Sequence, residues 1–121
     1  MRELVIAGRR IADDAPVYVV AELGQNHQGQ VKIGERLIRA AAECGVSAVK
    51  FQKRDNRMLY APSLYDAPYE HDQSFGATYG AHREALELDR AAFEHLQGEA
   101  YLQNVACFAT AFDEASADIL M

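Results

Sequence analysis

Three short apolar runs, each separated from the next by a segment of helical character, constrain the fold of this chain more than any other feature. The runs predict strands over residues 17–21, 47–52 and 105–110. Between them, apolar residues recur every three to four positions, which predicts helices over about 31–44 and 90–104. Alternating strands and helices build a parallel sheet with right-handed crossovers, so the sequence predicts an α/β fold.

Cap and turn residues agree with these boundaries. Gly45 is a suitable C-terminal stop for the first helix, and Asp89 is a suitable N-cap for the second. Asp113 is expected to cap a third helix that begins at about Glu114. Ahead of the first strand, residues 5–11 predict a small β-hairpin around a glycine turn.

The segment between the second strand and the second long helix is expected to be mostly loop. Residues 53–79 contain Pro62 and Pro68 and several tyrosines. Loops of this length inside compact domains are usually functional or disordered. A short helix is expected just after it, around residues 82–86.

The predicted sheet has few strands for a parallel sheet. Three parallel strands leave both edges unpaired, whereas parallel sheets are normally covered. We therefore expect residues 1–121 to be a single partial domain, the N-terminal portion of a (β/α)8 TIM barrel, a fold that needs about 250 residues. In chain order this portion is a β-hairpin, then β-α-β-α-β and the start of a further helix.

Composition limits the classes of partner. The net charge of −6 argues against a nucleic-acid partner, which usually requires a basic patch, but not against an anionic small molecule. The chain has no run of about 18 apolar residues that would span a membrane, and its start lacks a secretory signal, so we expect a cytoplasmic protein. Cys44 and Cys107 are expected to be buried, reduced thiols, with a disulfide left open as the alternative.

Polar residues stand at the carboxyl ends of the three predicted strands. They are Glu22 after the first strand, Lys50 and Gln52 in the second, and Thr110 in the third. Because active sites of (β/α)8 barrels form at this edge, we expect these side chains to converge. Lys50 has two candidate partners that the pattern does not separate, a salt bridge to Glu22 and a substrate phosphate or carboxylate.

The loop after the first strand, residues 24–29, reads GQNHQG. Its glycines permit a tight turn and a close approach of backbone to a ligand. The spacing fits neither GxGxxG nor a P-loop, which argues against a nucleotide site. A lone histidine such as His27 is more often structural than ligating, and the histidines at 71, 82 and 95 lack HxxxH metal spacing.

Four stretches together resemble the sialic acid synthases, the N-acetylneuraminate synthase family: AELGQNHQG, AVKFQK, TYGAHREALEL and CFATAF. The resemblance implies a TIM barrel that condenses phosphoenolpyruvate with N-acetylmannosamine or its 6-phosphate and releases phosphate. It also implies assistance by a divalent metal, Mn or Mg, and a homodimer for the full-length enzyme. An antifreeze-like C-terminal domain and the metal ligands would lie outside this chain, so this part alone is expected to be inactive.

The resemblance also implies roles for the residues at the strand ends. Glu22 matches the catalytic acid at the end of the first strand, where it would stabilise positive charge or position water. Lys50 matches a lysine that binds phosphoenolpyruvate. Gln52 and Thr110 match positions that line the amino-sugar site, and Phe112 is expected to form a wall of it.

Two alternatives to this function stay open at this point. One is a related nonulosonate synthase with a different acceptor, of the legionaminate or pseudaminate type. The other is a non-catalytic α/β binding module that retains these residues through ancestry. Tyr79 and His82 lie in a motif typical of the family but receive no role, and Ala111 stands where some members have a proline, so the shape of that loop is open.

Overall fold

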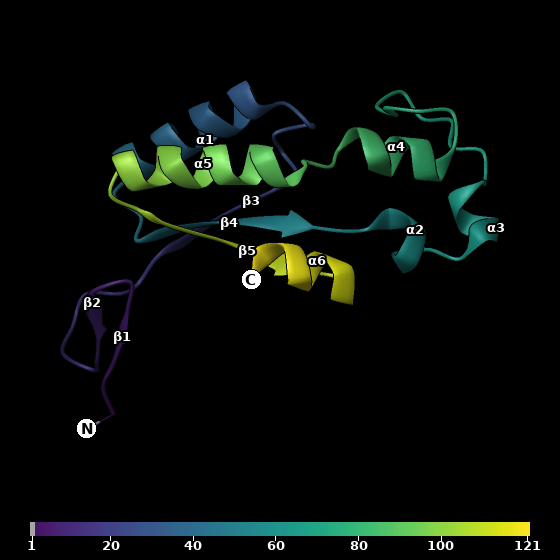
Figure 1. Ribbon diagram of the computed structural model, residues 1–121. Helices are drawn as coiled ribbons and strands as arrows, with labels where there is room; N and C mark the ends of the chain where they lie inside the picture. Colours follow the sequence, from purple (N-terminus) through teal and green to yellow (C-terminus); the bar gives the residue numbers. More distant parts are fainter. Residues whose placement is uncertain (1) are drawn as a thin grey trace.

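A computed structural model describes residues 2–121 as a three-stranded parallel sheet, helices that pack on it, and a two-stranded hairpin set apart from the rest (Figure 1). The elements in chain order are β1 (Leu4–Ile6), β2 (Arg9–Ile11), β3 (Val20–Gly24), α1 (Val31–Glu43), β4 (Ala48–Lys53), α2 (Asn56–Leu59), α3 (Pro62–Tyr65), α4 (Tyr79–Ala85), α5 (Arg90–Leu102), β5 (Ala106–Ala111) and α6 (Glu114–Leu120).

The sheet has the order β3-β4-β5, and both pairings are parallel, which confirms the predicted α/β fold. Its register sets Glu22 beside Lys50 and sets Gln52 beside Thr110. Residues at consecutive strand ends therefore meet at one edge, although they are far apart in the sequence. Strand β4 lies in the centre, so its side chains have neighbours on both sides.

Helices α1 and α5 lie side by side over one face of the sheet (Figure 1). Ile38 of α1 and Leu96 of α5 are fully buried with Phe51 of β4, and these residues form the centre of the core. Gly34 lets the two helices approach closely, because a Cβ there would lie 2.9 Å from the methyl carbons of Leu96. The apolar spacing predicted for both helices is thus confirmed by their buried faces.

The predicted helix caps are present. The Asp89 carboxylate accepts a hydrogen bond of 2.8 Å from the backbone N–H of Ala92 and so begins α5. Asp113 caps α6 in the same way through the backbone N–H of Ser116 at 2.7 Å. Gly45 has a φ of +80°, the left-handed conformation that ends α1. Local sequence chemistry therefore determined where these helices begin and end.

The first strand of the sheet begins later than predicted. Strand β3 spans Val20–Gly24 instead of 17–21, because pairing with β4 begins only at Val20. Val17 precedes the strand and is 83% exposed, so an apolar run here was not sufficient to indicate a buried strand. Glu22 consequently lies within β3, not in the loop after it. The bounds of β4 and β5 differ from the prediction by one residue at each end.

The prediction of one long loop over residues 53–79 is wrong in part. Two short helices, α2 and α3, interrupt it, and an isolated antiparallel bridge joins Pro68 to Thr78. Asp55 caps α2 with its side chain, and Pro62 occupies the first turn of α3, where its missing N–H costs nothing. Helices of four residues are too short for apolar periodicity to reveal them. Helix α4 also begins earlier than the short helix expected around residues 82–86.

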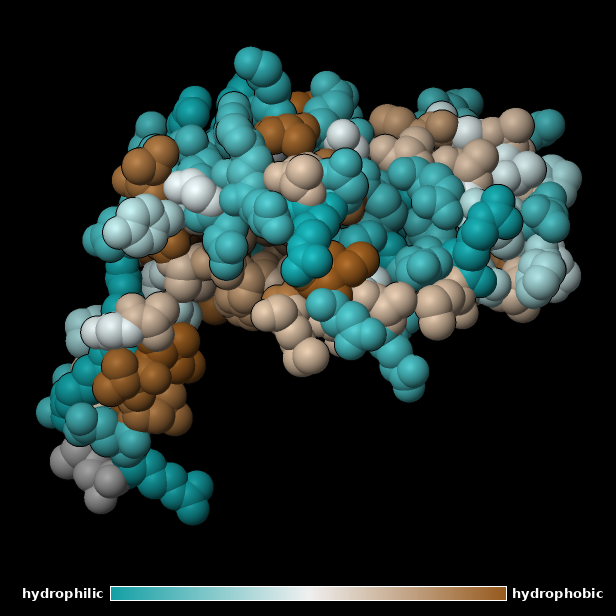
Figure 2. Space-filling view, in the orientation of Figure 1, coloured by the Kyte–Doolittle hydropathy of each residue, from teal (hydrophilic) through white to brown (hydrophobic). Residues whose placement is uncertain are grey.

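The predicted hairpin is confirmed as the antiparallel pair β1-β2. Its turn contains Ala7 and Gly8, both with positive φ, as tight hairpin turns require. The side chains of Leu4 and Val5 are 51% and 63% exposed. They contribute to the apolar surface on the hairpin in Figure 2. Within residues 2–121, no helix has the length and apolar character needed to cross a bilayer.

The thiols of Cys44 and Cys107 differ in their exposure to solvent. Both cysteines are free, but Cys44 is exposed at the end of α1, so its predicted burial is wrong. Cys44 follows the last turn of α1 as its C-cap residue, beyond the buried Ala41. Cys107 on β5 is partly buried against the helices, and this burial raises its pKa to about 11. Cys107 is therefore a protonated, unreactive thiol at neutral pH.

Replacing Gly98 with alanine is expected to raise the free energy of unfolding by about 1 kcal/mol. Gly98 lies inside α5 on an exposed side, and a Cβ there would meet no atom within 4 Å. Alanine thus improves helix propensity without a steric cost. Urea unfolding measures the change. Gly34→Ala is the matched comparison, because its Cβ would press on Leu96. Equal effects of the two substitutions would contradict this account.

Candidate active site

The predicted site residues lie on the face of the sheet that α1 and α5 do not cover. Along β4, Val49 and Phe51 are fully buried toward the helices, whereas Lys50 and Gln52 alternate with them and are partly exposed. Thr110, the neighbour of Gln52 on β5, is exposed on the same side. The structure therefore brings the polar groups of neighbouring strands to one face.

Glu22 and Lys50 form an ion pair at the centre of this face. The Lys50 Nζ lies 2.8 Å from a carboxylate oxygen of Glu22, and their side chains are 31% and 45% exposed. A pair this accessible contributes little to stability, about 0–1 kcal/mol. The Lys50 ammonium group can therefore leave Glu22 and bind an anionic ligand with little loss of stability. Both candidate partners of Lys50 remain compatible with this geometry.

Gly24 closes the end of β3 against the same group of residues. The pairing with β4 shifts between Glu22 and Gly24, and Gly24 has a φ of +55°. A Cβ at this position would lie 3.6 Å from the Glu22 carboxylate and 3.7 Å from the Gln52 amide nitrogen. Because Gly24 lies close to both side chains, they belong to one cluster. The bulge bends the strand end toward it.

Phe112 lies just beyond β5 and extends this cluster along the strand ends. Its backbone N–H donates to the carbonyl of Lys53 at 3.1 Å, which ties the ends of β4 and β5 together. Its ring is 40% exposed, and the Arg54 guanidinium carbon lies 3.8 Å from the ring centroid. The five predicted site residues thus lie along one face of the sheet, from the middle of β3 and β4 to just beyond β5, with Arg54 beside Phe112.

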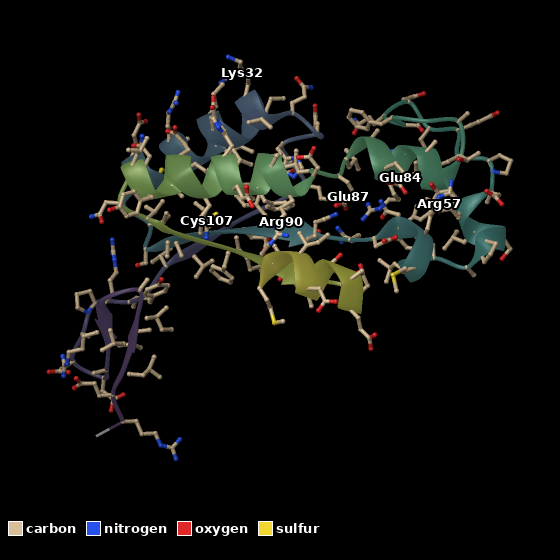
Figure 3. The ribbon with its side chains drawn as sticks, viewed as in Figure 1. Lys32, Arg57, Glu84, Glu87, Arg90 and Cys107 are labelled. Carbon is tan, nitrogen blue, oxygen red and sulfur yellow. The ribbon has the colours of Figure 1, made fainter. Side chains whose placement is uncertain are left out.

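Sequence reasoning missed a buried network around Glu87, which lies in the connection between α4 and α5 (Figure 3). One carboxylate oxygen accepts from the Gln25 side chain at 2.6 Å. The other lies 3.2 Å from the Lys53 ammonium and 3.3 Å from the backbone N of Arg54. Glu87 therefore ties the loop after β3 to the end of β4.

Both charges of this network are nearly removed from solvent. The side chains of Lys53 and Glu87 are each 10% exposed. Burial raises the pKa of Glu87, while the Lys53 ammonium opposes that rise. The signal that could have indicated this network is an acid placed between Leu86 and Leu88, two apolar residues that are both buried.

His27 is a structural residue of the GQNHQG loop. Its side chain is 1% exposed, and its Nδ1 accepts from the backbone N–H of Gly29 at 3.0 Å. Its ring contacts Phe51 at a centroid distance of 5.9 Å. Gly29 has a φ of +72°, and a Cβ there would overlap the carbonyl oxygen of Ala85. The glycine thus allows the loop to pack on the end of α4.

Burial lowers the pKa of His27 to about 4 from an ordinary value of 6.5. The unfolded chain binds this proton below pH 6.5 and the folded chain does not, so stability is lost as the pH falls from 6.5 to about 4. We expect His27 to account for a loss of about 3 kcal/mol over this range. Urea unfolding at several pH values measures it. His27→Gln should show a shallower decline, and an identical slope would contradict the expectation.

The two motif residues without an assigned role pack in an aromatic cluster. The Tyr79 ring lies 5.1 Å from Tyr60 and 5.4 Å from Tyr69, and the His82 ring lies 4.6 Å from Tyr69. His82 Nδ1 also accepts from the backbone N–H of Phe75 at 3.1 Å. These contacts hold α4 against the segment before it, so packing explains both residues.

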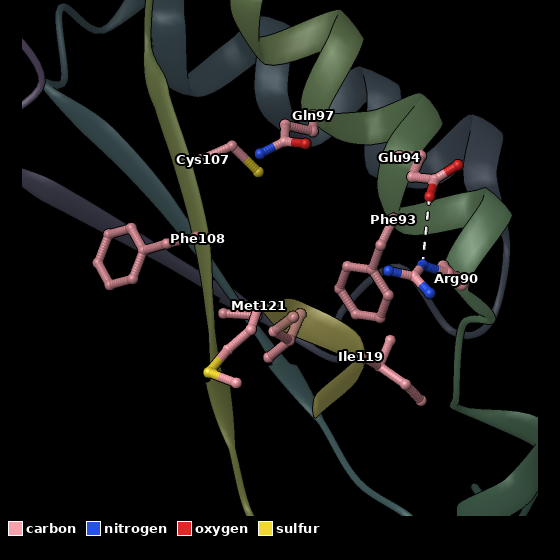
Figure 4. Close-up of a pocket in the computed structure, with 10 residues that line it drawn as sticks. Arg90, Phe93, Glu94, Gln97, Cys107, Phe108, Ile119 and Met121 are labelled. Carbon is pink, nitrogen blue, oxygen red and sulfur yellow. Dashed lines mark ion pairs between the residues drawn. The ribbon is translucent and has the colours of Figure 1, made fainter. Parts of the chain in front are cut away.

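A cavity of about 350 Å³ lies on another part of the structure, between α5, β5 and α6 (Figure 4). Cys107 and Gln97 face it, and the ion pair between Arg90 and Glu94 lies at its side. None of the predicted site residues lines this cavity. It follows the unpaired side of β5, where the sheet ends.

Fold and site together define an α/β protein with a parallel sheet and a cluster of acid, lysine, amide and hydroxyl groups at the carboxyl ends of its strands. Parallel α/β proteins place their ligand sites at this edge. The profile of the NeuB family matches residues 37–121, and the chain belongs to that family.

Individual relatives agree with this assignment. The chain is 36% identical to N-acetylneuraminate-9-phosphate synthase of Mus musculus over 115 residues, 93% of this chain and 32% of the relative. It is 33% identical to N,N'-diacetyllegionaminic acid synthase of Campylobacter jejuni, over 84% of this chain and 31% of the relative. The chain thus spans about a third of the length of these curated relatives, and the predicted resemblance to sialic acid synthases is confirmed.

The fold also matches a solved structure. The N-acetylneuraminic acid (sialic acid) synthetase of Leptospira borgpetersenii superposes with a TM-score of 0.78 over 98% of this chain and 37% of that one. The two sequences are 24% identical, so this match concerns the fold alone.

Proposed function

We propose that this chain is part of a sialic acid synthase-like transferase that condenses phosphoenolpyruvate with N-acetylmannosamine or its 6-phosphate and releases phosphate. The observation that carries the proposal is the Glu22–Lys50 pair, 2.8 Å apart on the uncovered face of the sheet in a NeuB family chain. An acid and a cation in contact suit a reaction in which an anionic substrate develops positive charge at carbon. The part described here is expected to be inactive alone.

The proposal includes the fold of the whole enzyme. Residues 1–121 would form the N-terminal portion of a (β/α)8 barrel and not a complete domain. The sheet has an unpaired edge at β5 beside an open cavity, and the relatives are about three times as long. A further strand paired with β5 would cover that cavity, as parallel sheets require. The homodimer and the cytoplasmic location stay predictions.

The chemistry assigns distinct tasks to the cluster. C3 of the enolpyruvate attacks the sugar aldehyde, and positive charge then develops at C2, where water must add. The C2–O bond to the phosphate then breaks, so phosphate leaves and a keto group remains at C2. The Glu22 carboxylate would stabilise this charge or position the water. Lys50 would bind the phosphate or carboxylate of phosphoenolpyruvate. Gln52 and Thr110 would hydrogen-bond the amino sugar, and the Phe112 ring would form a wall.

A divalent metal, Mn or Mg, would polarise the aldehyde oxygen in the complete enzyme. The part of the chain from residue 2 to 121 brings together no three His, Cys, Asp or Glu side chains that could hold such an ion. Glu22 already pairs with Lys50, so these residues do not fit a metal site. The tasks assigned to this chain therefore use its own side chains alone, and ligands outside it stay a prediction.

Replacing Lys50 with alanine in the intact protein tests the proposal. We expect the KM for phosphoenolpyruvate to rise about 10- to 100-fold, because a charge-assisted hydrogen bond to the substrate is lost. The KM for the sugar should change much less. Phosphate release measures both constants. Lys32→Ala is the matched control, since Lys32 is an exposed lysine on α1 (Figure 3). An unchanged KM for phosphoenolpyruvate would remove the role of Lys50.

A second candidate is a nonulosonate synthase with a different acceptor, which the similarity to the legionaminic acid synthase favours. Both candidates share the chemistry of Glu22 and Lys50. Phosphate release from phosphoenolpyruvate across a panel of amino sugars separates them, because only the preferred acceptor supports rapid turnover.

A further inference from the structure

Arg54 is a buried cation that lacks an acidic partner in the part of the chain the structure describes. The residue is 9% exposed, and it follows directly after β4. Its guanidinium lies on the Phe112 ring, and its Nη1 has no hydrogen-bond partner among residues 2–121. The nearby Glu87 carboxylate binds the backbone N of Arg54 and the Lys53 ammonium, not the guanidinium.

Two further residues, Arg83 and Asn56, also have buried polar atoms without a hydrogen-bond partner among residues 2–121. Burial and the positive charge of Arg83 on α4 both lower the pKa of Arg54. The Nε of Arg83 is itself buried without a hydrogen-bond partner within residues 2–121. Asn56, two residues after Arg54, is 1% exposed, and neither atom of its amide is bonded in this range. Two positive charges and an unsatisfied amide therefore lie at the carboxyl end of β4.

We propose that Arg54, assisted by Arg83, binds the phosphoryl group of a phosphorylated amino-sugar acceptor. Burying an unpaired cation is costly, so the site is complete only when an anion joins it. The planar fork of a guanidinium matches phosphate oxygens with two parallel hydrogen bonds. The Phe112 ring packs against one face of the Arg54 guanidinium, so the N–H groups along the edge of the guanidinium remain available to a ligand.

Position along the strand indicates which substrate carries this phosphoryl group. Lys50 and Gln52 alternate along one face of β4, and Arg54 follows the end of the strand, where its guanidinium lies on the Phe112 ring. At about 3.3 Å per residue, the Cα atoms of Lys50 and Arg54 are about 13 Å apart. Lys50 is already assigned to phosphoenolpyruvate, so an anion at Arg54 would be a second one. The second anion must therefore belong to the acceptor, whose hydroxyls would meet Gln52 on the way. This inference rests on the proposed function; it selects the phosphorylated one of the two acceptors and names the side chain that binds its phosphoryl group.

The test compares two acceptors with the intact protein. Phosphate release from phosphoenolpyruvate gives kcat/KM for N-acetylmannosamine 6-phosphate and for N-acetylmannosamine. In Arg54→Gln, the ratio of the first to the second should fall about 10- to 100-fold. Arg83→Gln should lower it in the same direction. The matched control is Arg57→Gln, because that guanidinium lies on the Tyr65 ring, 4.5 Å from its centroid, and should leave the ratio unchanged.

Other results would overturn the assignment. An equal loss for both acceptors, with a lowered melting temperature, would mean that Arg54 pairs with a carboxylate elsewhere in the protein. A raised KM for phosphoenolpyruvate alone would place that substrate at Arg54. If Arg54→Gln does not fold, Arg54→Lys keeps the charge without the fork, and an unchanged ratio in that variant would also count against bidentate binding.

A binding measurement separates this proposal from the proposed function. If the wild-type protein releases no phosphate with any amino sugar, the proposed function fails. Calorimetry with three separate probes then tests Arg54: the 6-phosphate, the unphosphorylated sugar and inorganic phosphate. Weaker binding of the 6-phosphate alone in Arg54→Gln supports the site. The site is overturned if the 6-phosphate binds equally well to the wild-type protein and to Arg54→Gln. It is also overturned if inorganic phosphate binds the wild-type protein as tightly as the sugar phosphate does.

Discussion

Replacing Glu22 with glutamine in the intact protein is expected to lower kcat for phosphate release about 10²- to 10³-fold. Glutamine has nearly the same shape but carries no negative charge, so the positive charge that develops at C2 loses its stabilising neighbour. The KM for phosphoenolpyruvate should change less. In the variant, no carboxylate at position 22 competes with the anionic substrate for the Lys50 ammonium group. Steady-state kinetics with saturating sugar measure kcat and the KM for phosphoenolpyruvate separately.

Stability separates a chemical role of Glu22 from a structural one. Glu22 is 45% exposed, so loss of its pair with Lys50 should alter the free energy of unfolding by no more than about 1 kcal/mol. The control is Glu94→Gln, which removes an exposed ion pair with Arg90 on α5 and should keep wild-type turnover. Wild-type turnover in Glu22→Gln would exclude the proposed role.

Replacing Glu87 with alanine is expected to lower the free energy of unfolding by about 3–5 kcal/mol. The reason is that Lys53 would remain buried, 10% exposed, without its carboxylate. The Gln25 side chain and the backbone N of Arg54 would lose an acceptor as well. Chemical denaturation measures the loss.

A double substitution checks that the unpaired charge causes this loss. Lys53→Met combined with Glu87→Met removes both charges and fills similar volume, so it should recover most of the stability. Glu84→Ala is the control, because Glu84 is exposed and its carboxylate accepts a single hydrogen bond within residues 2–121, from the Tyr65 hydroxyl at 3.1 Å (Figure 3). A loss below about 1 kcal/mol in Glu87→Ala would show that water replaces the carboxylate.

The sequence was sufficient for the elements whose signals are local. The cap residues Asp89 and Asp113 and the left-handed Gly45 predicted helix ends that the structure contains. The convergence of Glu22 with Lys50 was also predictable, because parallel strands bring their carboxyl ends to one edge. That rule needs only the order of the strands and no knowledge of side-chain packing.

Other features had no local signal. The start of β3 depends on where pairing with β4 begins, so the exposed Val17 misled the prediction. Helices α2 and α3 are too short for periodicity, and their cap and proline were the only indications. The partners of Glu87 come from three separate segments, and sequence spacing does not reveal such a contact.

The sequence by itself determined the order of the strands and of the two long helices, the edge at which the site forms, and the resemblance to the sialic acid synthases. Hydrophobic periodicity, capping and alternation are properties of neighbouring residues, and a chain displays them before it folds. Only the tertiary structure decided that Lys53 pairs with Glu87 and that Arg54 lies on Phe112 without an acidic partner in the described residues. These contacts join residues far apart in the chain, and only packing brings them within hydrogen-bonding and contact distance.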